Sequence, residues 1–320
     1  MSARNDPVAR VLVIKLGPLV DLVQALPAMA QIRKVHPQAH IALLTTPTFG
    51  EFAKACALFD TVLTEGRPKG LRGHLNLFRR LRRGRYKRVY DLQSSRTTGS
   101  FRLAFFPFIP PWITASAEVR ALPALHRYWD QLADAGDADP IPAGQPAPKP
   151  DLAWATRAAT RGGRSIREQL GLQAPFALMI PGSIPGRPLV RWPAKSYAGL
   201  AGELMQMGLT PVVAGGAQEA GLAEAIQRYV PQTVILTGRV SPIELAALAR
   251  DAKLTVGTNP VYTLIAGFAG SPTLLLLPAD LIARQRPRTD DRLTVLQKDD
   301  LADLSSDEVL KACEGLLRRA

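Results

Sequence analysis

The sequence predicts an α/β protein built from two doubly wound domains, each with a parallel sheet. Short apolar runs alternate with helical patterns along both halves of the chain, as in successive strand–helix–strand units. A proline-rich stretch interrupts this alternation near the middle. The length of 320 residues also corresponds to two domains, at about 150 residues per domain.

The first half of the chain carries five apolar runs of strand length. We expect strands at residues 10–15, 40–45, 61–64, 88–92 and 112–114. Helical patterns lie between them, for example at 22–35 and 49–58. A further amphipathic helix is expected within the segment 67–88, where apolar residues recur at helical spacing: Leu71, Leu75, Phe78 and Leu81.

The stretch 136–150 breaks the pattern. Five prolines fall between Pro140 and Pro150, and such a density favours an extended, semi-rigid connector. We therefore expect one domain over residues 1–150, with its linker at 136–150, and a second domain over residues 151–320.

The alternation restarts after the prolines. Strands are expected at 176–180, 210–214, 233–236, 254–257 and 273–277, and helices at 194–207, 218–229, 242–250, 262–269 and 306–317. One helix start is well marked: Ser241 can be the N-cap, Pro242 occupies N1 and Glu244 completes a capping box. Ligands of such sheets bind beyond the carboxyl ends of the strands, so we expect the two domains to face a cleft.

The charge, cysteine content and apolar run lengths of the chain limit the kinds of partner and protein class that are expected. The net charge is +13 and the isoelectric point about 10.2, which suggests a polyanionic partner: nucleic acid, anionic lipid or phosphorylated glycan. Two cysteines are too few for a disulfide framework. No apolar run reaches the roughly 18 residues of a membrane span, and no signal peptide is evident. These features predict a soluble cytoplasmic protein.

Most of the charge lies in one segment. Ten basic residues and no acid occur within 67–88, so this segment alone carries +10. One interpretation is a solvated helix face; another is a membrane-surface patch or a site for an anionic acceptor. Nucleic acid is unlikely, because the segment has few aromatic side chains for base stacking. We place the anionic-ligand surface at Arg79, Arg80, Arg82 and Arg83.

Three strand-to-helix loops could carry chemistry. In the first, 15–21, Asp21 stands near a helix N-terminus and could accept a proton from a hydroxyl, or simply cap the helix. We group Lys15, at the start of this loop, with the acceptor side.

The second and third loops lie in the other half. In the second, 181–193, Ser183, Arg187 and Arg191 could hold a diphosphate, although an ordinary loop fits equally well. In the third, Gly257 and Asn259 precede a helix, where Pro260 removes an amide donor and is also a plain helix-start signal. Four histidines and two cysteines provide no convincing metal-ligand set.

The order of these loops resembles glycosyltransferase family 9, the ADP-heptose:lipopolysaccharide heptosyltransferases, over residues 11–278. Six further stretches support the resemblance: Ala-Leu-Pro-Ala at 25–28, Tyr-Asp-Leu-Gln at 90–93, Arg-Trp-Pro at 191–193, Gly-Gly-Ala-Gln-Glu at 215–219, Leu-Thr-Gly-Arg at 236–239 and Ala-Gly-Ser-Pro at 269–272.

The resemblance implies a GT-B fold, with an acceptor-binding N-terminal and a nucleotide-sugar-binding C-terminal domain. It implies inverting, metal-independent transfer from an ADP-linked sugar to the lipopolysaccharide core or a related glycan, without a cofactor. By this resemblance Asp21 matches the general base, and Glu219 falls where the family places an acid near the donor's nucleoside. It also implies a cytoplasmic protein that binds an anionic glycolipid. Such a protein can associate peripherally with the surface of the inner membrane.

Five positions depart from the family pattern. Val20 replaces the glycine before the base and Val190 a lysine before Arg-Trp-Pro; Asn259, Val261 and Leu264 replace an aspartate, a glycine and a histidine. Because several of these changes remove groups aimed at phosphate or sugar, Ser183, Arg187 and Arg191 are the available substitutes. The changes also motivate an alternative, a catalytically silent or donor-switched homologue that binds glycolipid or a partner enzyme.

Overall fold

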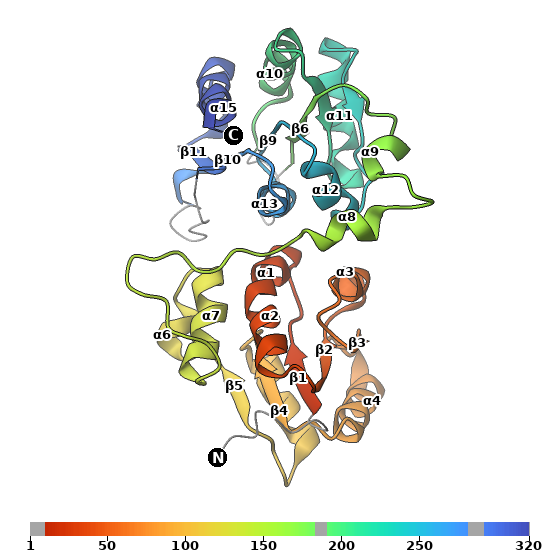
Figure 1. The fold of residues 1–320 in the computed structure, drawn as a ribbon, viewed down its shortest axis with the longest axis vertical. Coiled ribbons are helices and arrows are strands. Elements are labelled where there is room, and N and C mark those ends of the chain that lie inside the picture. The colour runs from red at the N-terminus through yellow and green to blue at the C-terminus, as the bar shows by residue number, and fades with distance from the viewer. Residues whose placement is uncertain (1–9, 183–190, 281–290, 320) are drawn as a thin grey trace. The chain divides into compact units, whose positions relative to one another are not determined.

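The structure, a computed structural model, describes residues 10–182, 191–280 and 291–319. The chain divides into two compact units, residues 1–150 (unit 1) and 151–320 (unit 2), each built around one sheet (Figure 1). All strand pairs in both sheets are parallel. This is the α/β architecture that the alternation of apolar runs and helical patterns predicts.

Unit 1 has a five-stranded sheet in the order β3-β2-β1-β4-β5. The strands are β1 (Arg10–Ile14), β2 (His40–Leu44), β3 (Thr61–Leu63), β4 (Arg88–Asp91) and β5 (Trp112–Thr114). The connecting segments are α1 (Leu19–Gln24), α2 (Leu26–Val35), η2 (Pro47–Phe49), α3 (Gly50–Ala55), α4 (Gly70–Arg83), α5 (Arg96–Ser100), η3 (Phe101–Phe105), α6 (Ala117–Arg120) and α7 (Ala124–Asp134).

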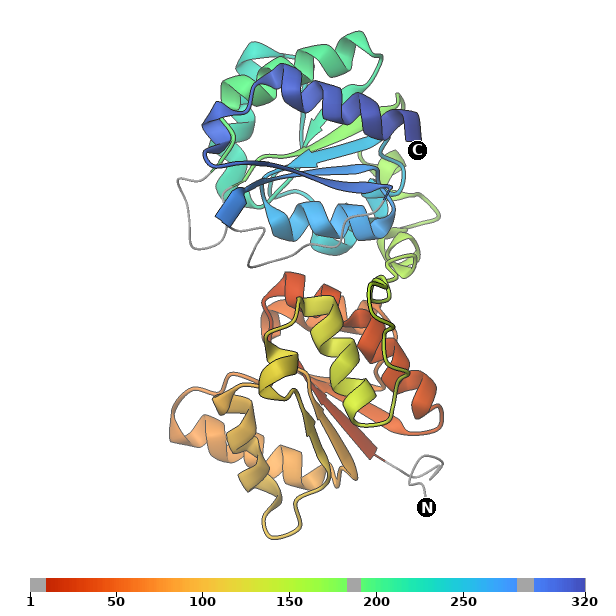
Figure 2. The ribbon, with the colours of Figure 1, turned by 90° about the vertical axis from the view of Figure 1, so that its left-hand side faces the viewer.

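Both faces of this sheet are covered. Leu12 and Ile14 of β1 point to a core shared with Leu77 of α4 and Phe101 of η3. Successive strand residues point to opposite faces, so Val11 and Val13 face the other layer. Figure 2 shows α4 and η3 on one side of the sheet and α1, α2 and α7 on the other.

Two expectations for unit 1 are corrected. The single helix expected at 22–35 is two helices. The first helix ends before Ala25, and Pro27 lies in the first turn of the second helix. In the basic helix, Leu77 and Leu81 make the buried stripe, whereas Leu71 and Leu75 are exposed. Apolar periodicity identified α4 but did not include Leu77, which faces the core, whereas Phe78 packs only partly against that core.

The proline-rich stretch 136–150 has no helix or strand, and it is anchored to unit 1. Asp137 is buried, accepts a hydrogen bond from the Tyr90 hydroxyl over 2.8 Å and pairs with Arg88. Ala147 is buried as well. The segment therefore follows the surface of unit 1 as an extended strap.

Unit 2 has a six-stranded sheet in the order β11-β10-β9-β6-β7-β8. The strands are β6 (Phe176–Ile180), β7 (Thr210–Val213), β8 (Val234–Ile235), β9 (Leu254–Gly257), β10 (Thr273–Pro278) and β11 (Leu293–Lys298). The helical segments are α8 (Trp154–Ala159), α9 (Ile166–Gln169), α10 (Ala194–Gln206), η4 (Ala217–Glu219), α11 (Ala220–Tyr229), α12 (Pro242–Ala249), α13 (Pro260–Ala269), η5 (Leu301–Asp303) and α15 (Ser306–Arg319).

The capping box predicted at the start of α12 is confirmed. The Ser241 side chain accepts a hydrogen bond from the Glu244 backbone, and Glu244 accepts one from the Ser241 backbone over 2.8 Å. The strand β11 does not follow from the sequence pattern: it is an edge strand in which only Leu293 is buried, and its apolar signal is weak. None of the helices in the described ranges combines the length and the hydropathy needed to cross a bilayer.

Candidate active site

Each sheet has one point at which the strand order reverses. Unit 1 places successive strands on one side of β1 and then continues with β4 on the other side, and unit 2 does the same with β6 and β9. Ligands of open α/β sheets bind outside the carboxyl ends of the strands at such a point. Each unit therefore has its own candidate site, formed by the residues that follow its two central strands.

In unit 1 this edge carries Asp21. The Lys15 Nζ donates to Oδ2 of Asp21 over 3.5 Å and to Oε1 of Gln93 over 3.2 Å, so it bridges the loops after β1 and β4. The Leu16 backbone N–H donates to the same Gln93 oxygen. Arg127 of α7 approaches Oδ2 of Asp21 to 3.7 Å. The Asp21 side chain keeps 27% of its surface exposed, so a ligand can reach it.

Lys15 is a buried cation. Only 1% of it is exposed, and its Nζ lies 4.9 Å from the centre of the Tyr128 ring. Burial lowers its pKa to about 8, against the opposing charge of Asp21, and the charge of Arg127 lowers it further. Lys15 is thus not part of an exposed anionic-ligand surface, as grouped from sequence; it lies beneath Asp21 and orients that carboxylate.

This burial predicts a pH-dependent cost to folding. Below pH 8 Lys15 is protonated in both states, and the folded state bears the full penalty of a buried charge. Between pH 8 and 10.5 only the unfolded state keeps the proton, so the contribution of Lys15 to the free energy of unfolding rises with pH. Relative to Lys15→Met, the wild type should gain about 2 kcal/mol between about pH 7.5 and pH 10 in denaturant titrations. A difference that stays constant with pH would contradict this.

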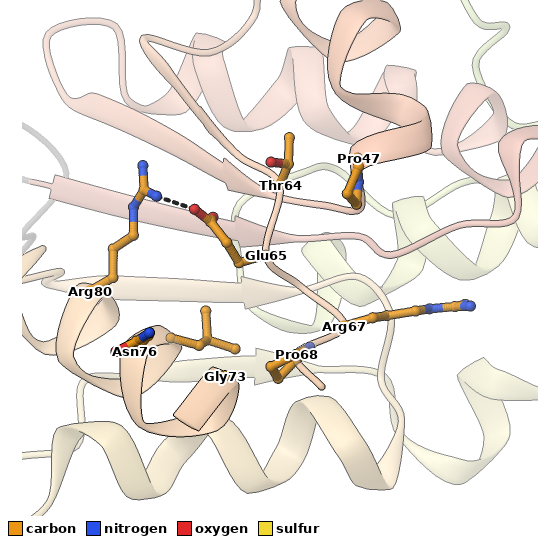
Figure 3. Close-up of a pocket in the computed structure, with 9 residues that line it drawn as sticks. Pro47, Thr64, Glu65, Arg67, Pro68, Gly73, Asn76 and Arg80 are labelled. Atoms are coloured by element: carbon orange, nitrogen blue, oxygen red, sulfur yellow. Dashed lines mark hydrogen bonds and ion pairs between the residues drawn. The ribbon is translucent and has the colours of Figure 1, made fainter. Parts of the chain in front are cut away.

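A pocket of about 380 Å³ lies at the same edge of unit 1, beyond β2 and β3 (Figure 3). Its lining includes Thr64, Arg67 and Asn76, together with an ion pair between Glu65 and Arg80. Gly66 allows this loop to lie against the first loop, because a Cβ there would come within 2.2 Å of the Leu16 side chain. The pocket is therefore a neighbour of the Lys15–Asp21 loop.

In unit 2 the carboxyl end of β6 is fixed to that of β9. The Gly182 backbone N–H donates to Oγ1 of Thr258, which donates back to the Gly182 carbonyl oxygen over 2.7 Å. The buried Tyr197 hydroxyl lies 3.2 Å from the same Oγ1. A Cβ on Gly182 would lie 3.0 Å from the Asn259 side chain and 3.1 Å from Oε1 of Glu219. The loops after β6, β7 and β9 thus converge on one glycine.

Glu219 is the exceptional group of this cluster. It is buried, and its Oε2 has no hydrogen-bond partner among the described residues. Burial raises the pKa of its carboxyl. Burial and the charge of Glu219 also raise the pKa of Tyr262 on α13. A buried carboxylate oxygen without a partner costs free energy, so Oε2 is suited to an external donor such as a hydroxyl.

Asn259 acts on its own helix. Its Oδ1 accepts hydrogen bonds from the backbone N–H groups of Val261 and Tyr262, over 3.0 and 3.3 Å, and caps α13. Gly257 is required for packing, since a Cβ there would come within 2.2 Å of Oγ1 of Thr263. Leu264, where the family pattern has histidine, is buried in α13.

The remaining predicted residues are separate from these clusters. Arg191 is exposed, whereas the adjacent Trp192 is fully buried. Ser183, Arg187 and Val190 lie outside the described residues. The basic residues predicted on α4 are all exposed, and Arg80 is paired with Glu65: Arg79, Arg80, Arg82 and Arg83.

Sequence reasoning missed several residues of the cluster around Asp21 in unit 1. Gln93 ends the Tyr-Asp-Leu-Gln stretch, and its position after a strand was the available signal. Arg127 and Tyr128 come from α7, a helix that the sequence pattern did not identify.

Within the described ranges, no group of three or more histidine, cysteine, aspartate or glutamate side chains could hold a metal ion.

Comparison with known proteins identifies the family. The family model described as glycosyltransferase family 9 (heptosyltransferase) matches residues 74–260, more than half of the chain. The chain belongs to glycosyltransferase family 9. It is accordingly a glycosyltransferase of the heptosyltransferase-like class. No curated protein matches the sequence.

Solved structures agree with the fold. E. coli ADP-heptose lipopolysaccharide heptosyltransferase II is similar, with a TM-score of 0.75 at 18% identity, over 97% of this chain and 99% of that one. A family 9 glycosyltransferase from Veillonella parvula gives 0.73 at 18%, over 98% of each chain. E. coli heptosyltransferase WaaC, solved with ADP-2-deoxy-2-fluoro heptose, gives 0.70 at 16%, over 95% and 99%. This chain thus has the GT-B fold, like these solved structures.

Proposed function

We propose that this family 9 member is an inverting, metal-independent glycosyltransferase that moves a sugar from an ADP-linked donor to a hydroxyl of the lipopolysaccharide core or a related anionic glycan. The proposal places the protein in the cytoplasm, at the inner-membrane surface where such an acceptor is exposed. One observation carries it: a reachable Asp21 carboxylate at the strand-order reversal of unit 1, held by Lys15 and Arg127.

In the proposed reaction Asp21 acts as the general base. Its carboxylate accepts the proton of the acceptor hydroxyl, and the resulting oxygen attacks the anomeric carbon of the donor. The bond from that carbon to the diphosphate breaks, and the nucleoside diphosphate leaves with the electron pair. Because Lys15 is tied to both Asp21 and Gln93, the base is oriented before the acceptor arrives.

The donor would be held by unit 2. The unpartnered Oε2 of Glu219 can accept a hydrogen bond from a hydroxyl of the nucleoside, which supports the role that the family resemblance gives this residue. Exposed Arg191 is available to the diphosphate. The solved relative WaaC was crystallised with ADP and with an ADP-linked heptose analogue, which supports an ADP-linked donor here.

The acceptor side would be held by unit 1. Arg67 lines the pocket beyond β3 and is exposed, so it can contact an anionic group of the glycan. The neighbouring arginines of α4 extend this positive surface. A phosphorylated glycan matches such a surface better than a neutral one.

A second candidate is a catalytically silent or donor-switched homologue that binds glycolipid or a partner enzyme. The geometry of α13 favours it, because the Asn259 side chain already occupies the first amides of that helix and Leu264 is buried where the family has histidine.

An assay of sugar transfer distinguishes an active transferase from a catalytically silent homologue. The full chain is incubated in EDTA with ADP- and UDP-linked sugars and a deacylated lipopolysaccharide core, and the anomer of the product is assigned by NMR. Absence of product with every donor would sink the transferase proposal.

Nucleotide binding gives an independent test. At about 100 times its dissociation constant, ADP should raise the free energy of unfolding by about 2.7 kcal/mol. Glu219→Gln should weaken ADP binding by about tenfold or more, since a hydrogen bond to a charged group is replaced by a weaker one. Glu224→Gln, at an exposed position on α11, is the matched control and should bind ADP as the wild type does. Equal binding by all three proteins would remove Glu219 from the donor site.

A further inference from the structure

The exposed apolar side chains of the described residues are concentrated in unit 1. Nine large apolar residues are exposed, and six of them fall between residues 71 and 109. These six are Leu71, Leu75, Leu103, Phe106, Phe108 and Ile109. Phe108 is 90% exposed and Leu71 is 77% exposed, so neither side chain contributes much to the core. Such a concentration on a protein surface marks an interaction site.

These six residues lie on α4, on η3 and in the loop that follows η3, and α4 and η3 contact each other. Leu71, Leu75 and Phe78 recur at spacings of four and three, and so share one side of α4. The Phe78 ring contacts the Phe101 ring of η3, with centroids 6.5 Å apart. This side of α4 is therefore the side next to η3, which carries Leu103 and leads into the loop with Phe106, Phe108 and Ile109. Figure 2 shows α4 and the 101–111 segment on the same side of unit 1.

The same region is strongly basic. Between residues 66 and 117 there are twelve lysines and arginines and one acid, Asp91, which is buried. Arg72, Arg79, Arg82 and Arg83 of α4 are exposed beside the apolar stripe. We call the six apolar residues and these four arginines the apolar–basic face.

We propose that the apolar–basic face docks unit 1 on an anionic lipid bilayer, with the side chains of the 106–109 loop inserted among the acyl chains and the arginines of α4 on the lipid headgroups. Apolar side chains gain by leaving water, and arginines gain at a negatively charged surface. A nucleic acid would engage the arginines and leave three adjacent apolar side chains of the loop exposed to water. This inference rests on the proposed function for its biological setting, but its chemistry involves no sugar transfer.

The test uses the full chain and co-sedimentation with vesicles of phosphatidylcholine alone or mixed with phosphatidylglycerol. The wild type should bind the anionic vesicles and not the neutral ones. The triple variant Phe106→Ser, Phe108→Ser and Ile109→Ser should bind about tenfold or more weakly. The triple variant Arg79→Gln, Arg82→Gln and Arg83→Gln should lose on the order of a hundredfold, at about fivefold per charge.

Two matched controls come from unit 2. The exposed apolar pair is changed by Met207→Ser and Tyr229→Ser, and the exposed basic pair by Arg228→Gln and Arg250→Gln. Both should bind as the wild type does. Phe108→Trp reports insertion directly, because its indole emission should shift to the blue on anionic vesicles.

Three results would overturn the proposal. These are no binding to anionic vesicles, binding that the serine variant does not weaken, or unshifted Phe108→Trp emission on bound vesicles. Binding of duplex DNA that depends on the arginines alone, without vesicle binding, would assign the face to nucleic acid.

Sugar transfer to a deacylated, soluble acceptor is measured in parallel, and its rate should be unchanged in the serine variant. Failure of transfer with vesicle binding intact would count against the proposed function and leave the docking face standing.

Discussion

Asp21→Asn should lower kcat for sugar transfer by about 10²–10⁴-fold while leaving the fold intact. Asparagine has the same shape as aspartate, and its side-chain oxygen can still contact Lys15 and Arg127. What it cannot do is accept and hold the proton of the acceptor hydroxyl. The effect should therefore fall on the chemical step, with little change in the KM of the nucleotide sugar, which unit 2 would bind.

The control for this variant is Asp134→Asn at the exposed C-terminal end of α7. It removes one carboxylate from the same unit without touching the loop after β1, and its kcat should equal that of the wild type. Far-UV circular dichroism and the unfolding midpoint of Asp21→Asn verify that the protein remains folded. More than half of the wild-type kcat in Asp21→Asn would exclude Asp21 as the base.

The position of the Asp21 carboxylate at this edge of the sheet could be predicted from sequence because it depends on local order. A carboxylate that follows the first apolar strand and opens a helix lies at the carboxyl edge of a parallel sheet, whatever the rest of the fold does. The environment of Asp21 could not be predicted in the same way. Lys15 bonds to Gln93, 78 residues away, and that contact exists only because β1 and β4 are neighbours in the sheet.

The strands were predictable for a similar reason. Buried parallel strands are continuous apolar runs, and nearly all of them were found. The edge strand β11 was missed because an edge is only half covered and its residues are mixed in polarity. The orientation of α4 was also misread, since its leucines occur on two sides and only tertiary packing selects Leu77 and Leu81 for the core.

The replaced family positions gain meaning from the structure. Asn259 retains a capping oxygen, so the start of α13 is stable without the aspartate. Leu264 packs in the interior of unit 2 as an ordinary core residue. Both changes preserve the fold while altering what the helix N-terminus offers a ligand. The side chains at these two positions are thus compatible with the capping and packing of α13.

Trp192→Ala should lower the free energy of unfolding by about 3–5 kcal/mol. Trp192 is fully buried, and its indole N–H donates to the Leu304 carbonyl oxygen over 2.9 Å. Its ring meets that of Tyr197 edge-on, with centroids 4.6 Å apart. Truncation removes all of these contacts and leaves a cavity beneath α10. Trp192→Phe keeps most of the ring packing and should cost about 1 kcal/mol for the lost hydrogen bond.

The same contacts connect Trp192 to the candidate donor site. Tyr197 lies against Thr258, which fixes Gly182 at the end of β6. Trp192→Ala should therefore also raise the KM of the nucleotide sugar, through displacement of that loop. Exposed Arg191 provides the contrast: Arg191→Gln should leave the free energy of unfolding within about 0.5 kcal/mol of wild type while weakening donor binding. Denaturant titrations of both variants, together with the KM of the nucleotide sugar, distinguish a structural role of Trp192 from a ligand-binding role of Arg191. Equal losses of stability in the two variants would contradict this distinction.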